Sequence, residues 1–308
     1  MPLLIDSTSK DLSPWIEGIK KELNGSDRIF TWGELENPEE ITTAIVWNHR
    51  PELFSRLPNV RLVCSLGAGV DHIMRDPLLP PDVLVSRVVS PYLSGPMSNF
   101  CLGAILYYQR KFDQYLIDKK NKEWHQEFNP ERNFTIGIMG LGELGTDLAQ
   151  KLLPLGFDVY GWSQSRKHVE GVTSYVADEL ELFLSSINVL VCLLPATPGT
   201  KGILSRPLFS KMNRGSYLIN VARGHHQVNE DILEALKDGT LAGAFLDVFP
   251  EEPLPADSPM WEHPDVFITP HIAVVTKREA AIPQIVANHF RVIAGEEPEN
   301  KVDRKKGY

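Results

Sequence analysis

Three side chains that could perform acid–base chemistry come shortly after apolar runs in the second half of the chain. They are Arg223, Glu252 and His271. A guanidinium is a planar cationic fork that can hold a carboxylate and polarise a carbonyl group. An imidazole titrates near neutral pH and can exchange a proton with a hydroxyl group, and a nearby carboxylate orients it. Together the three predict a site that binds a small acid and moves a proton.

The apolar runs before these residues predict buried strands with helices between them. The strands are expected at 188–194, 216–221, 242–248 and 266–269, and the helices at 180–184, 209–212 and 230–236. This alternation favours a parallel sheet, whose ligands bind beyond the carboxyl ends of the strands. Each side chain has an ordinary alternative: a surface salt bridge for Arg223, a solvated loop for Glu252 and a locally satisfied ring for His271. Their position at successive strand ends favours the functional interpretation.

The stretch 135–162 predicts the unit around which the chain is organised. An apolar strand at 135–139 leads into the turn Gly140-Leu141-Gly142-Glu143-Leu144-Gly145. A helix with Leu144, Leu148, Leu152 and Leu155 on one face and a strand at 157–162 follow. Strand, GxGxxG turn, helix and strand in about 30 residues predict a dinucleotide-binding βαβ unit.

Each glycine of this turn has a separate physical task. Gly140 allows the tight turn, Gly142 lets the backbone approach a pyrophosphate, and Gly145 lets helix and strand pack closely. The N-terminus of the helix offers N–H groups and the positive end of its dipole to the phosphates. An ordinary structural turn is the alternative, but the strand and helix on either side favour the dinucleotide site.

The end of the second strand of this unit indicates which dinucleotide binds. NAD sites carry an acidic residue about 20 positions after the glycines, where it binds the ribose 2′-hydroxyl. Here Ser163 lies 23 positions after Gly140 (163 − 140), and Ser165, Arg166 and Lys167 follow it. A 2′-phosphate suits these cations and meets no acidic residue. We expect NADPH to be preferred, with NADH possible; a solvated basic turn is the alternative.

The first part of the chain predicts a smaller α/β domain of its own. Strands are expected at 3–6, 43–47, 60–66 and 83–89, and helices at 12–23 and from 53 to 57. The third strand ends in a turn of small residues, 65–71, where the backbone N–H groups of Ala68 and Gly69 could hold a small anion. An ordinary strand-to-helix turn is equally compatible with this stretch.

A cluster of helix-breaking residues at 90–96 predicts a hinge between two domains. After it, 100–117 is expected to form one long helix and 119–132 an exposed excursion that contains Trp124. A closing helix is expected at 280–294. We therefore predict an α/β fold of two Rossmann-like or flavodoxin-like domains with parallel sheets and a cleft between them. Residues 1–97 with 280–308 would form the substrate-binding domain, and 98–279 the dinucleotide-binding domain.

Composition and charge exclude several classes of protein. The net charge of −9 argues against a nucleic-acid binder. No apolar stretch is long enough to cross a membrane, and the first residues lack the pattern of a signal peptide. Three scattered cysteines suit reduced thiols in the cytoplasm rather than disulfides or a zinc site. His225 and His226 are adjacent without further ligands, so no metal is expected.

These spaced motifs resemble the D-isomer-specific 2-hydroxyacid dehydrogenase family over nearly the whole chain. The residues that carry the resemblance are 140–145, 220–224, 243–249, 252–254, 269–273 and, in the first domain, 67–71. The stretch 162–167 and the short length most resemble the branch of glyoxylate/hydroxypyruvate reductase A. There is one departure, because many members carry an acidic residue where this chain has Asn99. A carboxylate role at the hinge is therefore in doubt.

The resemblance implies a role for each candidate residue. Arg223 would bind the 2-oxo-acid carboxylate, His271 would donate the proton, Glu252 would be its partner, and Asp247 would lie near the nicotinamide. The other cofactor contacts would be residues 140–145, Trp162, Ser163, Ser165, Arg166, Lys167, Leu194, Pro195, Val221 and Ala222. The substrate contacts would be Trp47, Leu66, Gly67, Ala68, Gly69, Arg223 and His271. Trp47 is equally compatible with a core aromatic that caps its strand.

The resemblance also implies an activity and an assembly. The expected reaction is NADPH-dependent reduction of glyoxylate to glycolate and of hydroxypyruvate to D-glycerate. A homodimer through about residues 100–130 is expected, with Trp124 reaching the partner. Two alternatives stay open: a reductase of a bulkier 2-oxo acid, and a non-catalytic co-regulator that senses the dinucleotide. The intact set of Arg223, Glu252 and His271 favours an enzyme.

Overall fold

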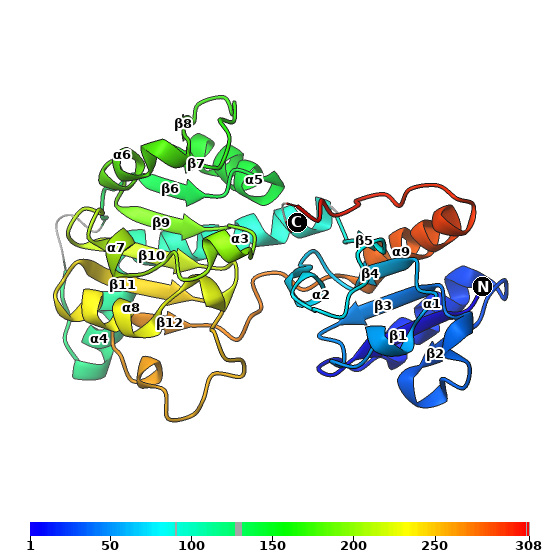
Figure 1. The fold of residues 1–308 in the computed structure, drawn as a ribbon. Helices are drawn as coiled ribbons and strands as arrows, with labels where there is room; N and C mark the ends of the chain where they lie inside the picture. Colours follow the sequence, from blue (N-terminus) through cyan, green and yellow to red (C-terminus); the bar gives the residue numbers. More distant parts are fainter. Residues whose placement is uncertain (90, 127–130, 306, 308) are drawn as a thin grey trace. The chain divides into compact units, whose positions relative to one another are not determined.

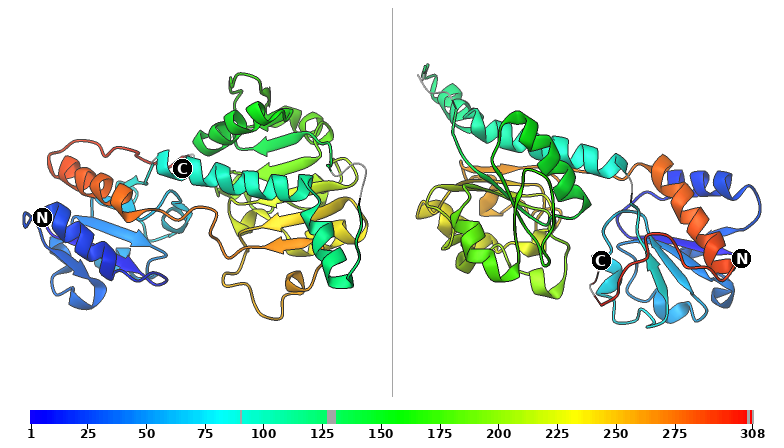
Figure 2. Two further views of the ribbon diagram at one scale, coloured as in Figure 1. Left: turned by 180° about the vertical axis from the view of Figure 1, so that it is seen from behind. Right: turned by 90° about the horizontal axis from the view of Figure 1, so that it is seen from above.

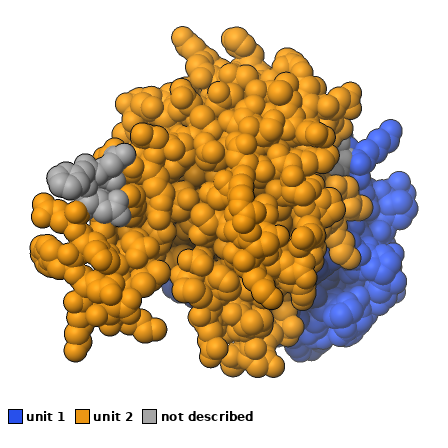
Figure 3. All heavy atoms as spheres, turned by 90° about the vertical axis from the view of Figure 1, so that its left-hand side faces the viewer, with its two compact units in different colours: residues 1–92, 275–308 blue, residues 93–274 orange. Residues whose placement is uncertain are grey.

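The computed structural model describes residues 1–89, 91–126, 131–305 and 307, and it divides into two compact units (Figures 1 and 3). Unit 1 comprises residues 1–92 and 275–308, and unit 2 comprises residues 93–274. The sequence placed both boundaries five residues later, after 97 and after 279. Position 90 of the expected hinge, positions 127–130 of the expected excursion, and positions 306 and 308 lie outside the described residues.

Unit 1 is built on a five-stranded parallel sheet with the order β2-β1-β3-β4-β5. Its strands are β1 (Leu3–Ser7), β2 (Ile29–Thr31), β3 (Thr43–Trp47), β4 (Leu62–Ser65) and β5 (Leu84–Ser86). The prediction missed β2. The helical segments are α1 (Ser13–Leu23), η1 (Trp32–Glu34), η2 (Pro38–Glu40), η3 (Phe54–Arg56), α2 (Asp71–Met74) and α9 (Arg278–Ile293).

Helices α1 and α9 cover one face of this sheet side by side (Figure 2). Trp15, Ile19 and Leu23 are buried on α1, as their helical spacing predicts. The two helices approach closely at Gly18, where an added Cβ atom would lie 2.4 Å from the side chain of Ile282. The last part of the chain is therefore packed into the domain formed by the first part.

Unit 2 contains a seven-stranded parallel sheet with the order β12-β11-β10-β9-β6-β7-β8 (Figure 1). Its strands are β6 (Ile136–Met139), β7 (Val159–Trp162), β8 (Thr173–Tyr175), β9 (Val189–Cys192), β10 (Ser216–Asn220), β11 (Leu241–Leu246) and β12 (Val266–Ile268). Strand β8 was not predicted. The strand order reverses between β6 and β9, and this topological switch point is where doubly wound sheets bind ligands.

The helical segments of unit 2 connect these strands. They are α3 (Pro91–Gln109, which begins in unit 1), α4 (Phe112–Asn121), α5 (Glu143–Leu152), η4 (Leu153–Leu155), η5 (Ala177–Glu179), α6 (Leu180–Ser185), η6 (Pro198–Thr200), α7 (Arg206–Phe209), η7 (Gly224–His226), α8 (Asn229–Lys237) and η8 (Pro259–Trp261). The prediction placed α7 three residues too late, at 209–212.

Two sequence predictions about the helices are wrong. The unit boundary after residue 92 falls within the hinge predicted at 90–96, but positions 91–96 are helical rather than a break, and Pro96 lies inside α3, where it leaves one i→i−4 hydrogen bond unmade. The single helix expected over 100–117 is divided between α3 and α4 at Lys111, whose φ of 58° is left-handed. No glycine or proline marks that position in the sequence.

The apolar face predicted for α5 is shorter than expected. Leu148 and Leu152 are fully buried, but Leu155 is 56% exposed. The α-helix ends at Leu152, and Pro154 lies in the short 3₁₀ turn that follows it. Leu155 therefore leaves the spacing that would have placed it on the buried face.

Candidate active site

The glycine turn between β6 and α5 has the geometry that a dinucleotide phosphate site requires. Gly140 has a φ of 108°, and an added Cβ atom would lie 2.7 Å from the carbonyl oxygen of Leu193. A Cβ atom on Gly145 would lie 2.0 Å from the carbonyl oxygen of Gly140, so strand end and helix are in contact there. By contrast, a Cβ atom on Gly142 would meet nothing within 4 Å. The backbone at Gly142, at the start of α5, is therefore open to close approach.

The loop after β7 is held against β8. The Ser163 N–H donates to the Tyr175 carbonyl (3.2 Å), and the Ser163 hydroxyl donates to the Ser165 carbonyl (2.7 Å). Ser163 is buried, whereas the side chains of Ser165, Arg166 and Lys167 are exposed. The cations that were predicted to meet a 2′-phosphate therefore reach solvent at the carboxyl end of the sheet.

The remaining predicted cofactor residues lie in or beside the sheet at its carboxyl ends. Trp162 ends β7, Leu194 and Pro195 follow β9, and Val221 and Ala222 follow β10. Leu141 is buried against Gly161, where an added Cβ atom would lie 2.2 Å from its side chain. Glu143 and Leu144 begin α5, with Glu143 exposed. Most of these side chains are buried, so these residues would contact a ligand mainly through their backbone N–H and C=O groups.

His271 and Glu252 form a direct pair after β12 and β11. The Nδ1 atom of His271 lies 2.6 Å from Oε2 of Glu252, and the other carboxylate oxygen accepts the Phe249 N–H at 2.9 Å. Burial raises the pKa of the Glu252 carboxyl. The hydrogen bonds from His271 and Phe249 and the nearby charges of His271 and Arg223 outweigh burial, so its pKa lies below the ordinary value. Glu252 is therefore an ionised partner that fixes the ring through Nδ1.

Asp247 anchors the loop that carries His271. Its buried carboxylate accepts hydrogen bonds from the Thr269 hydroxyl (2.6 Å) and from the N–H groups of Ile272 and Ala273 (both 2.9 Å). Its carbonyl accepts the His271 N–H at 2.8 Å. This network holds His271 at a φ of 55°, a left-handed backbone that costs free energy outside glycine. The sequence motif contains these residues, but it gives no sign of the bonds between them.

Arg223 follows β10 on a loop shaped by a buried amide pair. Nδ2 of Asn220 donates to Oε1 of Gln227 at 2.7 Å, and the Asn220 side-chain oxygen accepts the Ala222 N–H at 3.2 Å. An added Cβ atom on Gly224 would lie 1.8 Å from the carbonyl carbon of Phe249, so this loop touches the loop that leads to Glu252. Sequence reasoning missed Asn220 and Gln227 as supports of Arg223, although both lie beside it in the chain.

The predicted substrate residues of unit 1 lie around the turn after β4. The Ser65 hydroxyl donates to the Gly69 carbonyl at 2.7 Å and accepts the Gly67 N–H at 3.2 Å, which fixes the turn. Trp47 lies over Gly67, where an added Cβ atom would be 2.6 Å from the indole ring. Leu66 is buried, whereas Ala68 and Gly69 are half-buried. The partly exposed turn and Trp47 thus lie together within this unit.

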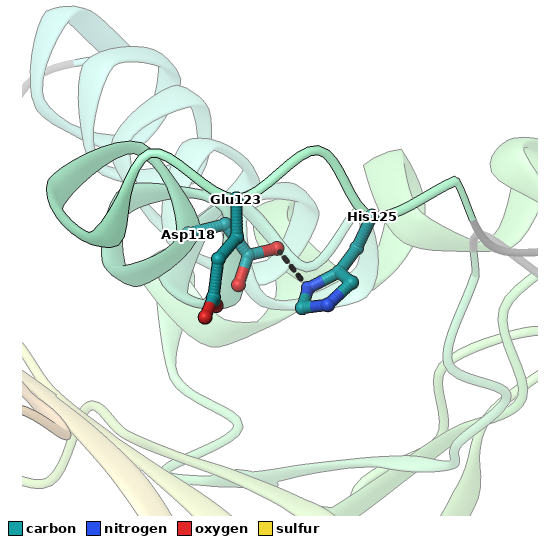
Figure 4. Close-up of side chains that lie close together, drawn as sticks. All are labelled: Asp118, Glu123 and His125. Atoms are coloured by element: carbon teal, nitrogen blue, oxygen red, sulfur yellow. Dashed lines mark ion pairs between the residues drawn. The ribbon is translucent and has the colours of Figure 1, made fainter.

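Among the described residues, one group has the spacing of metal ligands, and it lies outside this site. Asp118, Glu123 and His125 gather at the end of α4 (Figure 4). Nδ1 of His125 lies 3.3 Å from one oxygen of Asp118, and Gln114 donates to the other at 2.9 Å. Glu123 and His125 are exposed, and exposed acidic groups are common without an ion. Two further residues that could bind a metal lie elsewhere and are buried. Nε2 of His226 lies 3.2 Å from the carbonyl oxygen of Pro195. Burial raises the pKa of the Cys192 thiol to about 12.

Comparison with known proteins places these observations in a family. The family model described as the D-isomer specific 2-hydroxyacid dehydrogenase NAD binding domain matches residues 102–273. The chain is 40% identical over 302 residues to a glyoxylate/hydroxypyruvate reductase A of Serratia proteamaculans, a match that covers 96% of each protein. An equally similar reductase A occurs in Yersinia enterocolitica, at 40% identity.

Solved structures agree over the full length. A D-isomer specific 2-hydroxyacid dehydrogenase from Xanthobacter autotrophicus, in complex with NADPH and MES, has a TM-score of 0.91 and 36% identity, covering 100% of this chain and 99% of that one. An NADPH-dependent glyoxylate/hydroxypyruvate reductase from Sinorhizobium meliloti, in complex with NADP and sulfate, has a TM-score of 0.89 and 38% identity over 100% and 99% of the two chains. None of the described helices is long and apolar enough to cross a membrane. The chain belongs to the D-isomer specific 2-hydroxyacid dehydrogenase family and is an NAD(P)-dependent enzyme of that family.

Proposed function

We propose that this enzyme reduces small 2-oxo acids, with glyoxylate and hydroxypyruvate as substrates and glycolate and D-glycerate as products. The observation that carries the proposal is the pair formed by His271 and Glu252, 2.6 Å apart, with Arg223 acting on the same carboxylate. This arrangement provides a proton donor, an anion that holds it in place and a cation for a carboxylate. Reduction of a 2-oxo acid needs a hydride at the carbonyl carbon and a proton at its oxygen, and a cation can hold the substrate carboxylate.

The roles of the residues follow from their chemistry. The guanidinium of Arg223 binds the substrate carboxylate and polarises the 2-oxo group. A bound nicotinamide supplies the hydride for the carbonyl carbon. His271 donates the proton to the carbonyl oxygen as the charge develops there, and Glu252 stabilises the imidazolium before transfer. In unit 1, the N–H groups of Ala68 and Gly69 provide further donors for the carboxylate, and Trp47 borders the substrate.

NADPH is the preferred reductant in this proposal. Ser163 stands where an NAD-selecting acid would stand, and Arg166 follows in the exposed loop. The relatives from Xanthobacter and Sinorhizobium, which were solved with NADPH and NADP, support this choice. Arg166 is proposed as the main 2′-phosphate contact, with Ser163 and Lys167 assisting. Asp247 lies at the end of β11 and is proposed to approach the nicotinamide with its backbone.

The proposal includes a cellular setting and an assembly. A small polar substrate and buried thiols suit a cytoplasmic enzyme. Trp124 is 93% exposed, and such a large aromatic surface favours burial against a second copy of the chain. We therefore place the homodimer contact on the segment from α3 to Trp124. Unit 2 would bind the dinucleotide, and unit 1 would be the substrate-binding domain.

The direct test is a panel of 2-oxo acids assayed for kcat/KM with both reduced nicotinamides. Glyoxylate and hydroxypyruvate should have the highest values, and NADPH should exceed NADH. A higher value with phenylpyruvate would favour the bulkier substrate instead. If NADPH binds but no 2-oxo acid of the panel is reduced, the proposed substrates are wrong.

A further inference from the structure

The strongest unexplained contact near the cofactor loop is an ion pair made by Arg166. Nη2 of Arg166 lies 2.8 Å from both carboxylate oxygens of Glu179, and Nη1 donates to the Ser174 carbonyl at 2.5 Å. Glu179 lies at the end of η5, shortly after β8, the strand next to β7. The acid that is missing from the end of β7 is thus present one strand further along the sheet.

Glu179 is itself firmly placed. Its Oε2 atom accepts the Val176 N–H at 2.9 Å, which closes the turn between β8 and η5. The hydrogen bonds from the Val176 N–H and from Arg166 hold the pKa of this carboxyl below its ordinary value, although burial acts in the other direction. The carboxylate is therefore ionised at neutral pH and stays beside the guanidinium.

The geometry of a guanidinium makes this pair a competitor for a phosphate. An anion that accepts two hydrogen bonds from one guanidinium can do so in two ways. It accepts from Nε and Nη2 along the side of the group, or from Nη1 and Nη2 across its end, so Nη2 takes part in both. Glu179 engages Nη2, and Ser174 takes one N–H of Nη1. A 2′-phosphate that binds Arg166 with two prongs must share or displace Glu179. The 2′-phosphate would also come close to the negative charge of the Glu179 carboxylate.

We propose that Glu179 limits the preference for NADPH over NADH by competing with the 2′-phosphate for Arg166. This inference rests on the proposed contact between Arg166 and the 2′-phosphate. In NADH the 2′-hydroxyl carries no charge, so Glu179 neither repels it nor loses its partner to it. The positive charge of Arg166 and the negative charge of Glu179 would together set the ratio of the affinity for NADPH to the affinity for NADH.

The test is the dissociation constant of each oxidised cofactor, measured by titration calorimetry on the full chain. Glu179→Gln keeps an acceptor for the Val176 N–H but removes the charge. It should tighten NADP binding by about threefold to tenfold, the range of an exposed ion pair together with relief of repulsion. NAD binding should change by less than about twofold. The gain should shrink at high salt, because salt screens exposed charges.

Asp178→Asn is the matched control, since Asp178 is exposed, adjacent and carries the same charge. It should leave the ratio of the two dissociation constants unchanged. In an Arg166→Ala background, Glu179→Gln should keep only the gain in NADP binding that comes from relief of direct repulsion, so this arm separates competition for the guanidinium from the charge of Glu179 itself. Weaker or unchanged NADP binding in Glu179→Gln, or an equal gain in Asp178→Asn, would overturn the proposal. Failure of wild type to bind either cofactor would instead refute the proposed function.

Discussion

Replacing Asp247 by Asn tests whether this residue holds the catalytic loop. The carboxylate accepts two hydrogen bonds on Oδ1, from Thr269 and Ile272, and one on Oδ2, from Ala273. An amide keeps one oxygen, so its NH₂ group would face the Ala273 N–H. Asp247 is only 1% exposed, and solvent cannot compensate the mismatch.

The magnitude follows from these three bonds. A buried donor left unsatisfied costs about 1–3 kcal/mol, and each of the two remaining bonds loses its ionic assistance. We expect the free energy of unfolding to fall by about 2–5 kcal/mol in total. Because His271 lies on the same loop, kcat should also fall, by roughly 10- to 100-fold, since small misplacements of a catalytic group are costly.

Urea unfolding at neutral pH measures the stability, and NADPH oxidation with a saturating 2-oxo acid measures kcat. Asp257→Asn, an exposed loop position, is the matched control and should change the stability by less than about 0.5 kcal/mol. Wild-type stability and kcat in Asp247→Asn would refute the anchoring role. A higher dissociation constant for NADPH with unchanged stability and kcat would instead favour a cofactor contact.

Three further perturbations follow from the structure. His271→Ala should lower kcat by about 100- to 10,000-fold, while calorimetric titration should show little change in NADPH binding; near-normal turnover would reject the proton donor. Arg223→Lys should reduce kcat/KM for the 2-oxo acid by at least about tenfold despite the retained charge, because the two-pronged fork is lost; a value near wild type would show that a point charge suffices. Burial lowers the pKa of His289, although the ion pair with Asp27 opposes this. The folded state therefore resists protonation that the unfolded state accepts, and urea midpoints should fall as the pH drops below about 6.5. His289→Gln should flatten that slope, and an equally steep slope in the variant would assign it to other groups.

The sequence predicted most of the strands and the glycine turn, because strong local patterns encode them. The run from Thr135 to Trp162 contains apolar strands, three spaced glycines and a helical stripe, and each has one physical explanation. The structure has the predicted order of strand, turn, helix and strand and the contact of Gly145 with Gly140, although Leu155 lies outside the helical stripe. The edge strands β2 and β8 were missed, whereas the equally short edge strands β5 and β12 lie within the predicted apolar runs 83–89 and 266–269.

What the sequence could not supply was contact between segments far apart in the chain. Asp247 precedes Ala273 by 26 residues, and nothing local indicates that one carboxylate binds three groups of that loop. The pairing of Arg166 with Glu179 likewise depends on β8, which the sequence did not reveal. The helical state of positions 91–96 reflects the fold around them rather than the breaker residues they contain.

The central claim is that the chain transfers hydride and a proton to the keto carbon and oxygen of a small 2-oxo acid. The most direct measurement is the product formed from hydroxypyruvate and NADPH, followed by loss of the reduced-nicotinamide absorbance and resolved on a chiral column. One glycerate should form for each NADPH consumed, all of it the D-isomer. Consumption without glycerate, or formation of the L-isomer, would contradict the central claim.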